Sequence, residues 1–254
     1  MILDRVTLTG ADNSVNPEEL IALSYEFPFV EWGILVGTMT VADEESFMPR
    51  YPSRKWIYDL LNKSQGDPRV RTSLHVCGYW VRQLLLGNNY LPHSLHSGFP
   101  RIQLNFHAEK TKCDKVKFCK VLQSLGNNHE FIFQVDGNGG NDHLYDVWDE
   151  MDRVGVNLSC VPLFDVSGGA GITPEVWPAP IWMKNDKDYV YHGYAGGLGP
   201  DNVLSELERI SEVAGSCRIW IDMETKIRTS DNLMFDLSLC REVLTKVRSF
   251  GIVE

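Results

Sequence analysis

The chain has 254 residues, of which 43% are hydrophobic, and its 34 Asp and Glu residues outnumber its 24 Lys and Arg residues to give a formal net charge of −10. This acidic balance argues against a large interface with the phosphate backbone of nucleic acid, although one local site can still hold a small anion. No apolar run approaches the roughly 18 residues of a membrane span, no signal-peptide pattern follows Met1, and the six cysteines show no CxxC spacing. We therefore expect a cytoplasmic protein of one domain, residues 1–254, with free thiols and without nucleic-acid or membrane partners.

Runs rich in β-branched and aromatic residues alternate with stretches of helical periodicity along the whole chain. The predicted strands cover residues 5–10, 29–37, 70–78, 101–106, 130–136, 158–165, 189–197 and 218–224. The predicted helices cover residues 16–27, 53–63, 81–87, 114–125, 143–155, 200–215 and 234–251. Eight strands that alternate with helices in a chain of this length predict an α/β fold, a single (β/α)8 TIM barrel, and a doubly wound open sheet is the alternative.

Barrels of this kind place their chemistry at the carboxyl ends of the strands, where Asp165 follows an apolar run. A partly buried carboxyl group at a strand end can act as a general acid or base, and the alternative is that it caps the following loop. Gly196 and Gly197 follow the next predicted strand and precede a helix. Their backbone N–H groups can bind an anion, unless the pair forms only a tight turn.

Arg50 lies in the long loop after the second predicted strand, where its guanidinium could bind a carboxylate with two hydrogen bonds. Other polar residues near strand ends are His75, Cys77, Asn105, His107, Gln134, Asp136, Asp222 and Glu224. They are either structural or, in the case of the His and carboxylate residues, ligands of a divalent metal. The first predicted strand carries no HxH pair, which argues against a metal site, and we also expect no cofactor.

Three segments, in this order, resemble phosphoribosylanthranilate isomerase, the tryptophan-pathway barrel that catalyses an Amadori rearrangement. They are LFDVSGGAG (163–171), YAGGLGPDNV (194–203) and IDME (221–224). Residues 6–10, 49–51 and 103–104 also align in order with the first strand, the Arg-Tyr loop and the fourth-strand Gln-Leu-His of that family. The resemblance implies a (β/α)8 barrel and an isomerase that acts on a phosphorylated substrate.

The resemblance also implies roles for individual residues. Asp165 would be the general acid that protonates the ribose ring oxygen, and Arg50 would contact the carboxylate of the substrate. The expected phosphate-binding residues are Gly168, Gly169, Gly196 and Gly197. Further substrate-binding residues are expected at Gln103, Asn105 and Asp222.

The general base departs from the family pattern. The family has a cysteine on its first strand, and Thr9 stands at that position here. Because an alcohol cannot take a carbon-bound proton at neutral pH unless another base activates it, Thr9 needs help or replacement, and Cys77 or Asp12 are the candidates. On the last strand Asp222 to Lys226 replace the Ser-Gly pair that holds phosphate in the family.

We therefore expect an isomerase-like enzyme that acts on a small anionic, phosphorylated metabolite, either as a monomer or as a homodimer. Two other functions stay open at this point. One is a catalytically silent barrel that binds a metabolite. The other is a metal-dependent lyase or hydrolase that uses His75, His107, Asp136 or Asp222.

Overall fold

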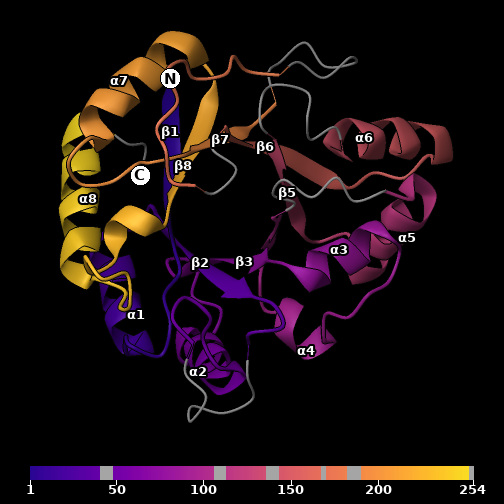
Figure 1. The fold of residues 1–254 in the computed structure, drawn as a ribbon, viewed down its shortest axis with the longest axis horizontal. Helices are drawn as coiled ribbons and strands as arrows, with labels where there is room; N and C mark the ends of the chain where they lie inside the picture. The colour runs from indigo at the N-terminus through magenta and orange to yellow at the C-terminus, as the bar shows by residue number, and fades with distance from the viewer. Residues whose placement is uncertain (41–47, 106–112, 136–142, 167–169, 182–189, 252–254) are drawn as a thin grey trace.

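Eight parallel strands form a closed barrel in the computed structural model, which describes residues 1–40, 48–105, 113–135, 143–166, 170–181 and 190–251. The strands are β1 (Ile2–Thr9), β2 (Val30–Val36), β3 (Arg71–Val76), β4 (Arg101–Leu104), β5 (Glu130–Val135), β6 (Ser159–Asp165), β7 (His192–Ala195) and β8 (Arg218–Met223). They follow one another around the barrel in sequence order, and β8 pairs with β1 (Figure 1). The predicted (β/α)8 barrel is confirmed.

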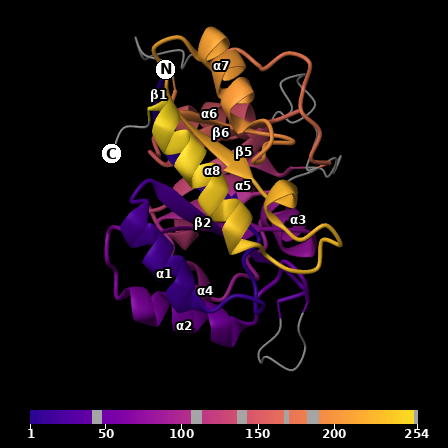
Figure 2. The ribbon, with the colours of Figure 1, turned by 90° about the vertical axis from the view of Figure 1, so that its left-hand side faces the viewer.

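Helices surround the outside of this barrel, as Figures 1 and 2 show. They are α1 (Pro17–Glu26), α2 (Arg54–Ser64), α3 (Tyr79–Leu85), α4 (His93–His96), α5 (Lys115–Leu125), α6 (His143–Val154), α7 (Val203–Ala214), α8 (Leu237–Phe250) and the 3-10 helix η1 (Thr225–Ile227). Sequence analysis did not predict α4 and η1, because elements this short show no helical period. None of the described helices is long and apolar enough to cross a membrane.

Helix boundaries follow the capping signals of the sequence. Asn16 opens α1 with a capping box, because its side chain accepts the N–H of Glu18 while the side chain of Glu19 accepts the N–H of Asn16. Helix α7 begins at Val203, three residues after the predicted start. The side chain of Asn202 instead accepts the N–H of Gly199, which holds residues 199–202 in a turn at the carboxyl end of β7.

Where one strand carries glycine, a large side chain of the neighbouring strand fills the barrel interior. A Cβ atom on Gly193 would lie 2.2 Å from Cε2 of Trp220, so the indole of Trp220 occupies the space beside this residue. Trp220 is fully buried and carries the guanidinium of Arg101 over its ring, 4.3 Å from the centroid. The middle of the barrel is therefore packed, and the open space lies toward one end.

A buried ion-pair network closes the barrel near the amino-terminal ends of the strands. Glu31 is fully buried and accepts hydrogen bonds from Nη1 of Arg5 at 2.9 Å, from Nη1 of Arg101 at 2.7 Å and from Oγ1 of Thr7 at 2.9 Å. Burial alone would raise the pKa of Glu31, but the two arginines and the hydrogen bonds lower it to about 2. This carboxylate is therefore charged and satisfied, as a structural group should be.

Candidate active site

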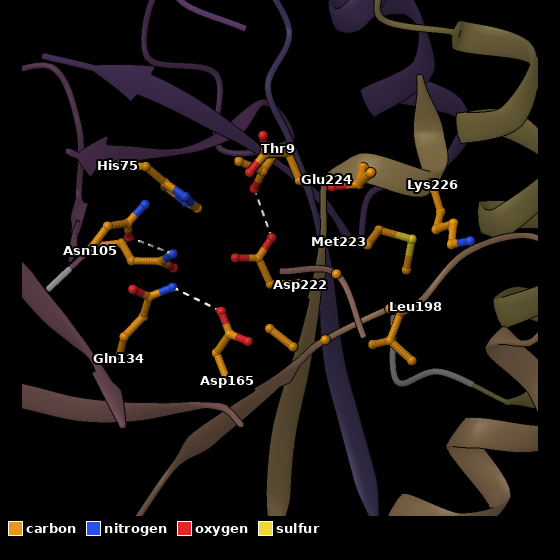
Figure 3. Close-up of a pocket in the computed structure, with 16 residues that line it drawn as sticks. Thr9, His75, Asn105, Gln134, Asp165, Leu198, Asp222, Met223, Glu224 and Lys226 are labelled. Atoms are coloured by element: carbon orange, nitrogen blue, oxygen red, sulfur yellow. Dashed lines mark hydrogen bonds between the residues drawn. The ribbon is translucent and has the colours of Figure 1, made fainter. Parts of the chain in front are cut away.

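A polar cavity opens at the carboxyl ends of the strands, on the face opposite the Glu31 network (Figure 3). It encloses about 550 Å³ of space, including solvent at its open mouth. Most strands contribute side chains near their ends. The lining includes Thr9 of β1, His75 of β3, Gln103 of β4, Gln134 of β5, Asp165 of β6 and Asp222 of β8. The groups that a ligand meets here are uncharged polar groups, carboxyl groups and the ammonium group of Lys226.

Asp165 and Asp222 reach the cavity from the same level of the barrel. Asp165 is the register partner of Ala195 on β7, and Ala195 is the partner of Asp222 on β8. Because neighbouring strands lie about 4.8 Å apart, the backbones of the two aspartates are roughly 10 Å apart with β7 between them. Figure 3 shows both carboxyl groups directed into the cavity. A small molecule between them can contact one carboxyl group on each side.

Asp222 has an acid–base character that its sequence position does not reveal. Burial, together with the nearby carboxylate of Glu224, raises its pKa to about 7, while hydrogen bonds from Thr9 and Gln103 act in the opposite direction. Sequence analysis grouped Asp222 with the substrate-binding residues and not with those that transfer protons. A group with a pKa near 7 is suited to take up and release protons at neutral pH.

Thr9 lies against Asp222 because the barrel leaves room for its side chain. Its hydroxyl donates a hydrogen bond of 2.7 Å to Oδ1 of Asp222. A Cβ atom on Gly33 of β2 would lie 2.2 Å from Oγ1 of Thr9 and 2.9 Å from the ring of His75, so glycine is required beside both side chains. Thr9 therefore stabilises the ionised form of a neighbouring carboxyl group.

Asp165 is buried and accepts a hydrogen bond of 3.2 Å from Nε2 of Gln134. The amide fixes the orientation of the carboxyl group at the end of β6. Asn105, predicted to bind substrate, lies on the same side of the cavity as Gln134 (Figure 3), and Gln103, which has the same predicted role, donates from its Nε2 to Oδ1 of Asn105 at 3.0 Å. The structure thus brings Asp165, Asp222, Gln103 and Asn105 into one cavity.

The loop after β7 lines the cavity with glycine backbone. Gly196 and Gly197 have φ angles of 124° and 61°, and a Cβ atom on Gly197 would lie 2.5 Å from the N atom of Thr173. Within the described part of the chain, the N–H groups of Gly196, Gly197 and Leu198 donate no hydrogen bond. Lys226 lines the cavity from the segment after β8. Such N–H groups together with a nearby ammonium can bind an anion.

Arg50 does not line the cavity itself, but it contacts a residue that does. Its guanidinium forms an ion pair with the carboxylate of Glu224, which does line the cavity. The backbone of Arg50 has a φ of 75°, and its N–H donates to Oδ2 of Asp12 at 2.7 Å. Asp12 is itself held by Arg228 at 2.9 Å, and both side chains are fully buried. A buried ion pair thus fixes Arg50 in an unfavourable backbone conformation beside the cavity.

Cys77 is also absent from the residues that line the cavity. Its sulfur accepts a hydrogen bond of 3.2 Å from Nδ2 of Asn105. Burial, together with the carboxylate of Glu224, raises the pKa of the Cys77 thiol to about 12. The sulfur is therefore protonated at neutral pH, which makes Cys77 a poor proton acceptor.

Several predicted residues lie outside the described part of the chain, namely Gly168, Gly169, His107 and Asp136. The other two residues of the metal hypothesis, His75 and Asp222, line the same cavity. Among the residues that the structure describes, no group of three or more His, Cys, Asp or Glu side chains could hold a metal ion.

The described architecture is that of a (β/α)8 barrel with a polar cavity at the carboxyl ends of its strands. No family model and no curated protein matches the sequence. Among solved structures, the chain is similar to phosphoribosylanthranilate isomerase from Thermus thermophilus, with a TM-score of 0.54, 13% sequence identity, and coverage of 96% of this chain and 98% of that one. It is also similar to 3-keto-L-gulonate-6-phosphate decarboxylase from Vibrio cholerae, with a TM-score of 0.43, 12% identity, and coverage of 98% and 99%. At 13% identity the likeness to the isomerase shows the barrel fold alone.

Proposed function

We propose that this protein is an isomerase-like enzyme that transfers protons on a small anionic, phosphorylated substrate placed between Asp165 and Asp222. The observation that carries the proposal is the pair of buried carboxyl groups at one level of the barrel, one of which has a pKa raised to about 7. An isomerisation needs one group to give a proton and another to take one, and a carboxyl group with a pKa near the working pH does this best.

An Amadori-type rearrangement fits this pair. Asp165 gives its proton to the ring oxygen of an aminated sugar as the bond between that oxygen and C1 breaks, which leaves an iminium ion. Asp222 then takes the proton from C2, and the electrons of that C–H bond form the double bond of an enaminol. Protonation of C1 and loss of the hydroxyl proton yield the ketone. In this scheme Asp222 accepts the proton in place of Thr9 or Cys77, and Thr9 stabilises the carboxylate by its hydrogen bond.

The anionic end of the substrate is assigned to the loop after β7. The N–H groups of Gly196 and Gly197 and the ammonium group of Lys226 are the cavity groups that favour a phosphate. A substrate that also carries a carboxylate could pair with Arg50 if Glu224 released it. The resemblance of the segments around Asp165, Gly196 and Asp222 to phosphoribosylanthranilate isomerase supports this orientation of the substrate.

Replacing Asp165 with asparagine tests the acid. The variant is expected to lose turnover by about 100-fold or more, because asparagine cannot donate a proton to the ring oxygen, while its thermal unfolding stays cooperative. Turnover is followed by the fluorescence of freshly made phosphoribosylanthranilate and, for a panel of sugar phosphates, by NMR of carbon-bound hydrogen exchange in D2O. Asp201→Asn, at an exposed position beside α7, is the matched control. Full activity of Asp165→Asn would overturn the assignment.

Replacing Thr9 with valine tests the coupling to Asp222. The hydrogen bond from Thr9 lowers the pKa of Asp222, so its loss should raise that pKa. Because Asp222 must be ionised to take a proton, the rising limb of the pH–rate profile should move to higher pH by roughly one unit, with the plateau rate largely kept. An unchanged midpoint of the rising limb would show that the ionisation of Asp222 does not determine this part of the pH–rate profile.

A further inference from the structure

Two buried polar atoms face the cavity from β3 and β4 and have no hydrogen-bond partner within the described residues: Nδ1 of His75 and Oε1 of Gln103. The two residues are register partners on adjacent strands, so their side chains lie side by side. His75 is 1% exposed and Gln103 is 2% exposed. An unsatisfied buried polar atom costs about 1–3 kcal/mol, and folded proteins rarely keep one without a role.

The His75 ring is neutral and held in place. Burial lowers its pKa to about 3, while Glu31 and Arg101 below it have opposing effects. Its Nε2 atom lies 3.0 Å from Oγ of Ser73, and the absence of a side chain on Gly33 makes room for the ring. Nδ1 is therefore the ring atom left for a ligand, and it offers a hydrogen bond without a charge.

The residues that line the cavity at the ends of β3 and β4 carry no charge, although Gln103 also donates a hydrogen bond to the carboxyl group of Asp222. His75 and Asn105 lie on one side of the cavity, where Gln103 donates to Asn105, and the carboxyl group of Asp165 is directed into the cavity from β6 (Figure 3). A hydroxyl group can donate to Oε1 of Gln103, and it can either donate to or accept from Nδ1 of His75. A carboxylate would meet the carbonyl oxygen of Gln103 with like partial charge, and an aromatic ring would leave both atoms unsatisfied.

We infer that His75 and Gln103 form a subsite for an uncharged, hydroxyl-bearing group, which makes the substrate a polyhydroxylated sugar phosphate. The inference deepens the proposed function, because it takes the phosphate to lie at Gly196 and Gly197. A site built to hydrogen-bond a hydroxyl group rejects the analogue that lacks it, since the buried polar atoms then stay unpaired. The His75–Gln103 subsite therefore sets which sugar phosphates are bound.

Calorimetric titration of the whole chain tests the subsite without any chemical step. The probes are ribose 5-phosphate and glucose 6-phosphate, the deoxy analogues of each, and inorganic phosphate. At least one deoxy analogue is expected to bind about tenfold more weakly than its parent, the loss that one unsatisfied buried group produces. Both parent sugars should also bind more tightly than inorganic phosphate.

Gln103→Met and His75→Phe remove one polar atom each while keeping the volume similar. In each folded variant the discrimination between parent and deoxy sugar should fall to about threefold or less, with the affinity for inorganic phosphate unchanged. Gln123→Met, at an exposed glutamine of α5, is the matched control and should discriminate like the wild type. The use of two positions keeps the test informative if one variant fails to fold.

Equal binding of parent and deoxy sugars by the wild type would overturn the inference. Unchanged discrimination in the folded variants would do the same, as would parent sugars that bind no better than inorganic phosphate. If the protein discriminated between parent and deoxy sugars but turned over none of the probes, the proposed function would be contradicted and the subsite would still be supported. If the protein turned over a probe but bound parent and deoxy sugars equally, only the subsite would be contradicted.

Discussion

Replacing Asp222 with asparagine is expected to remove proton transfer and to stabilise the folded protein above neutral pH. Asparagine cannot accept a carbon-bound proton, so turnover should fall by about 100-fold to 10,000-fold. The Oδ1 atom of asparagine can still accept the hydrogen bond that Thr9 donates to Asp222. The change in stability therefore reports mainly the loss of an ionisable group from a buried position.

The pH dependence of this stabilisation follows from the raised pKa of Asp222. Its pKa is about 7 in the folded protein and has an ordinary value of 3.8. Between these values the folded state holds a proton that the unfolded state has lost, so the stability of the wild type falls as the pH rises through this window. A shift of about three units corresponds to about 4 kcal/mol. The advantage of Asp222→Asn over the wild type should grow by about this amount from pH 4 to pH 8.

Urea unfolding followed by circular dichroism at several pH values measures this difference. Asp201→Asn removes an exposed carboxyl group and should show a nearly constant difference from the wild type. A constant difference for Asp222→Asn would mean that Asp222 has an ordinary pKa in the folded state, and the proposal for its role as proton acceptor would fail with it. A variant that is more stable but less active than the wild type is expected where a catalytic group is kept at a cost in stability.

The sequence predicted the barrel because each of its local signals agrees with the fold. Strands β1 to β8 all overlap the predicted apolar runs, and α1 begins directly after its N-cap Asn16, within the predicted range 16–27. The short elements α4 and η1 were missed because a single turn carries no periodicity. The late start of α7 was missed because the side chain of Asn202 holds the preceding turn, which propensities do not show.

The candidate site could be predicted only in part, because its electrostatics depend on pairs that are distant in the sequence. Thr9 and Asp222 are 213 positions apart, and Arg50 and Glu224 are 174 positions apart. The run Trp220-Ile221-Asp222 indicates a buried strand that ends in an acid, but not whether a cation lies beside it. The presence or absence of a neighbouring cation decides whether a buried carboxyl group is a charged structural group or has a pKa near 7. The sequence alone therefore could not predict the raised pKa of Asp222.

Replacing Glu31 with glutamine is expected to have the opposite effect on stability from replacing Asp222. Glu31 is buried between Arg5 and Arg101, and the pKa of its carboxyl group is lowered to about 2 from an ordinary value of 4.5. Removing this charge takes an ion-pair partner from the buried Arg101 and from the half-buried Arg5, although Arg101 keeps its ion pair with Glu130 and Arg5 keeps its ion pair with Asp4. The variant should lose about 3–5 kcal/mol of stability at pH 7.

Acid unfolding separates this electrostatic effect from a loss of packing. A carboxyl group with a lowered pKa contributes stability that is present above pH 4.5 and is lost as the pH falls toward 2. The difference between wild type and Glu31→Gln should therefore shrink over that range, whereas a packing defect would stay constant. Glu18→Gln, at an exposed ion pair on α1, is the control. Glu31 lies toward the amino-terminal end of the barrel and acts on Asp222 only as one of the weaker charges, so turnover per folded molecule should fall far less than in Asp222→Asn. A loss of turnover as large as that of Asp222→Asn would contradict the separate roles of the two ends of the barrel.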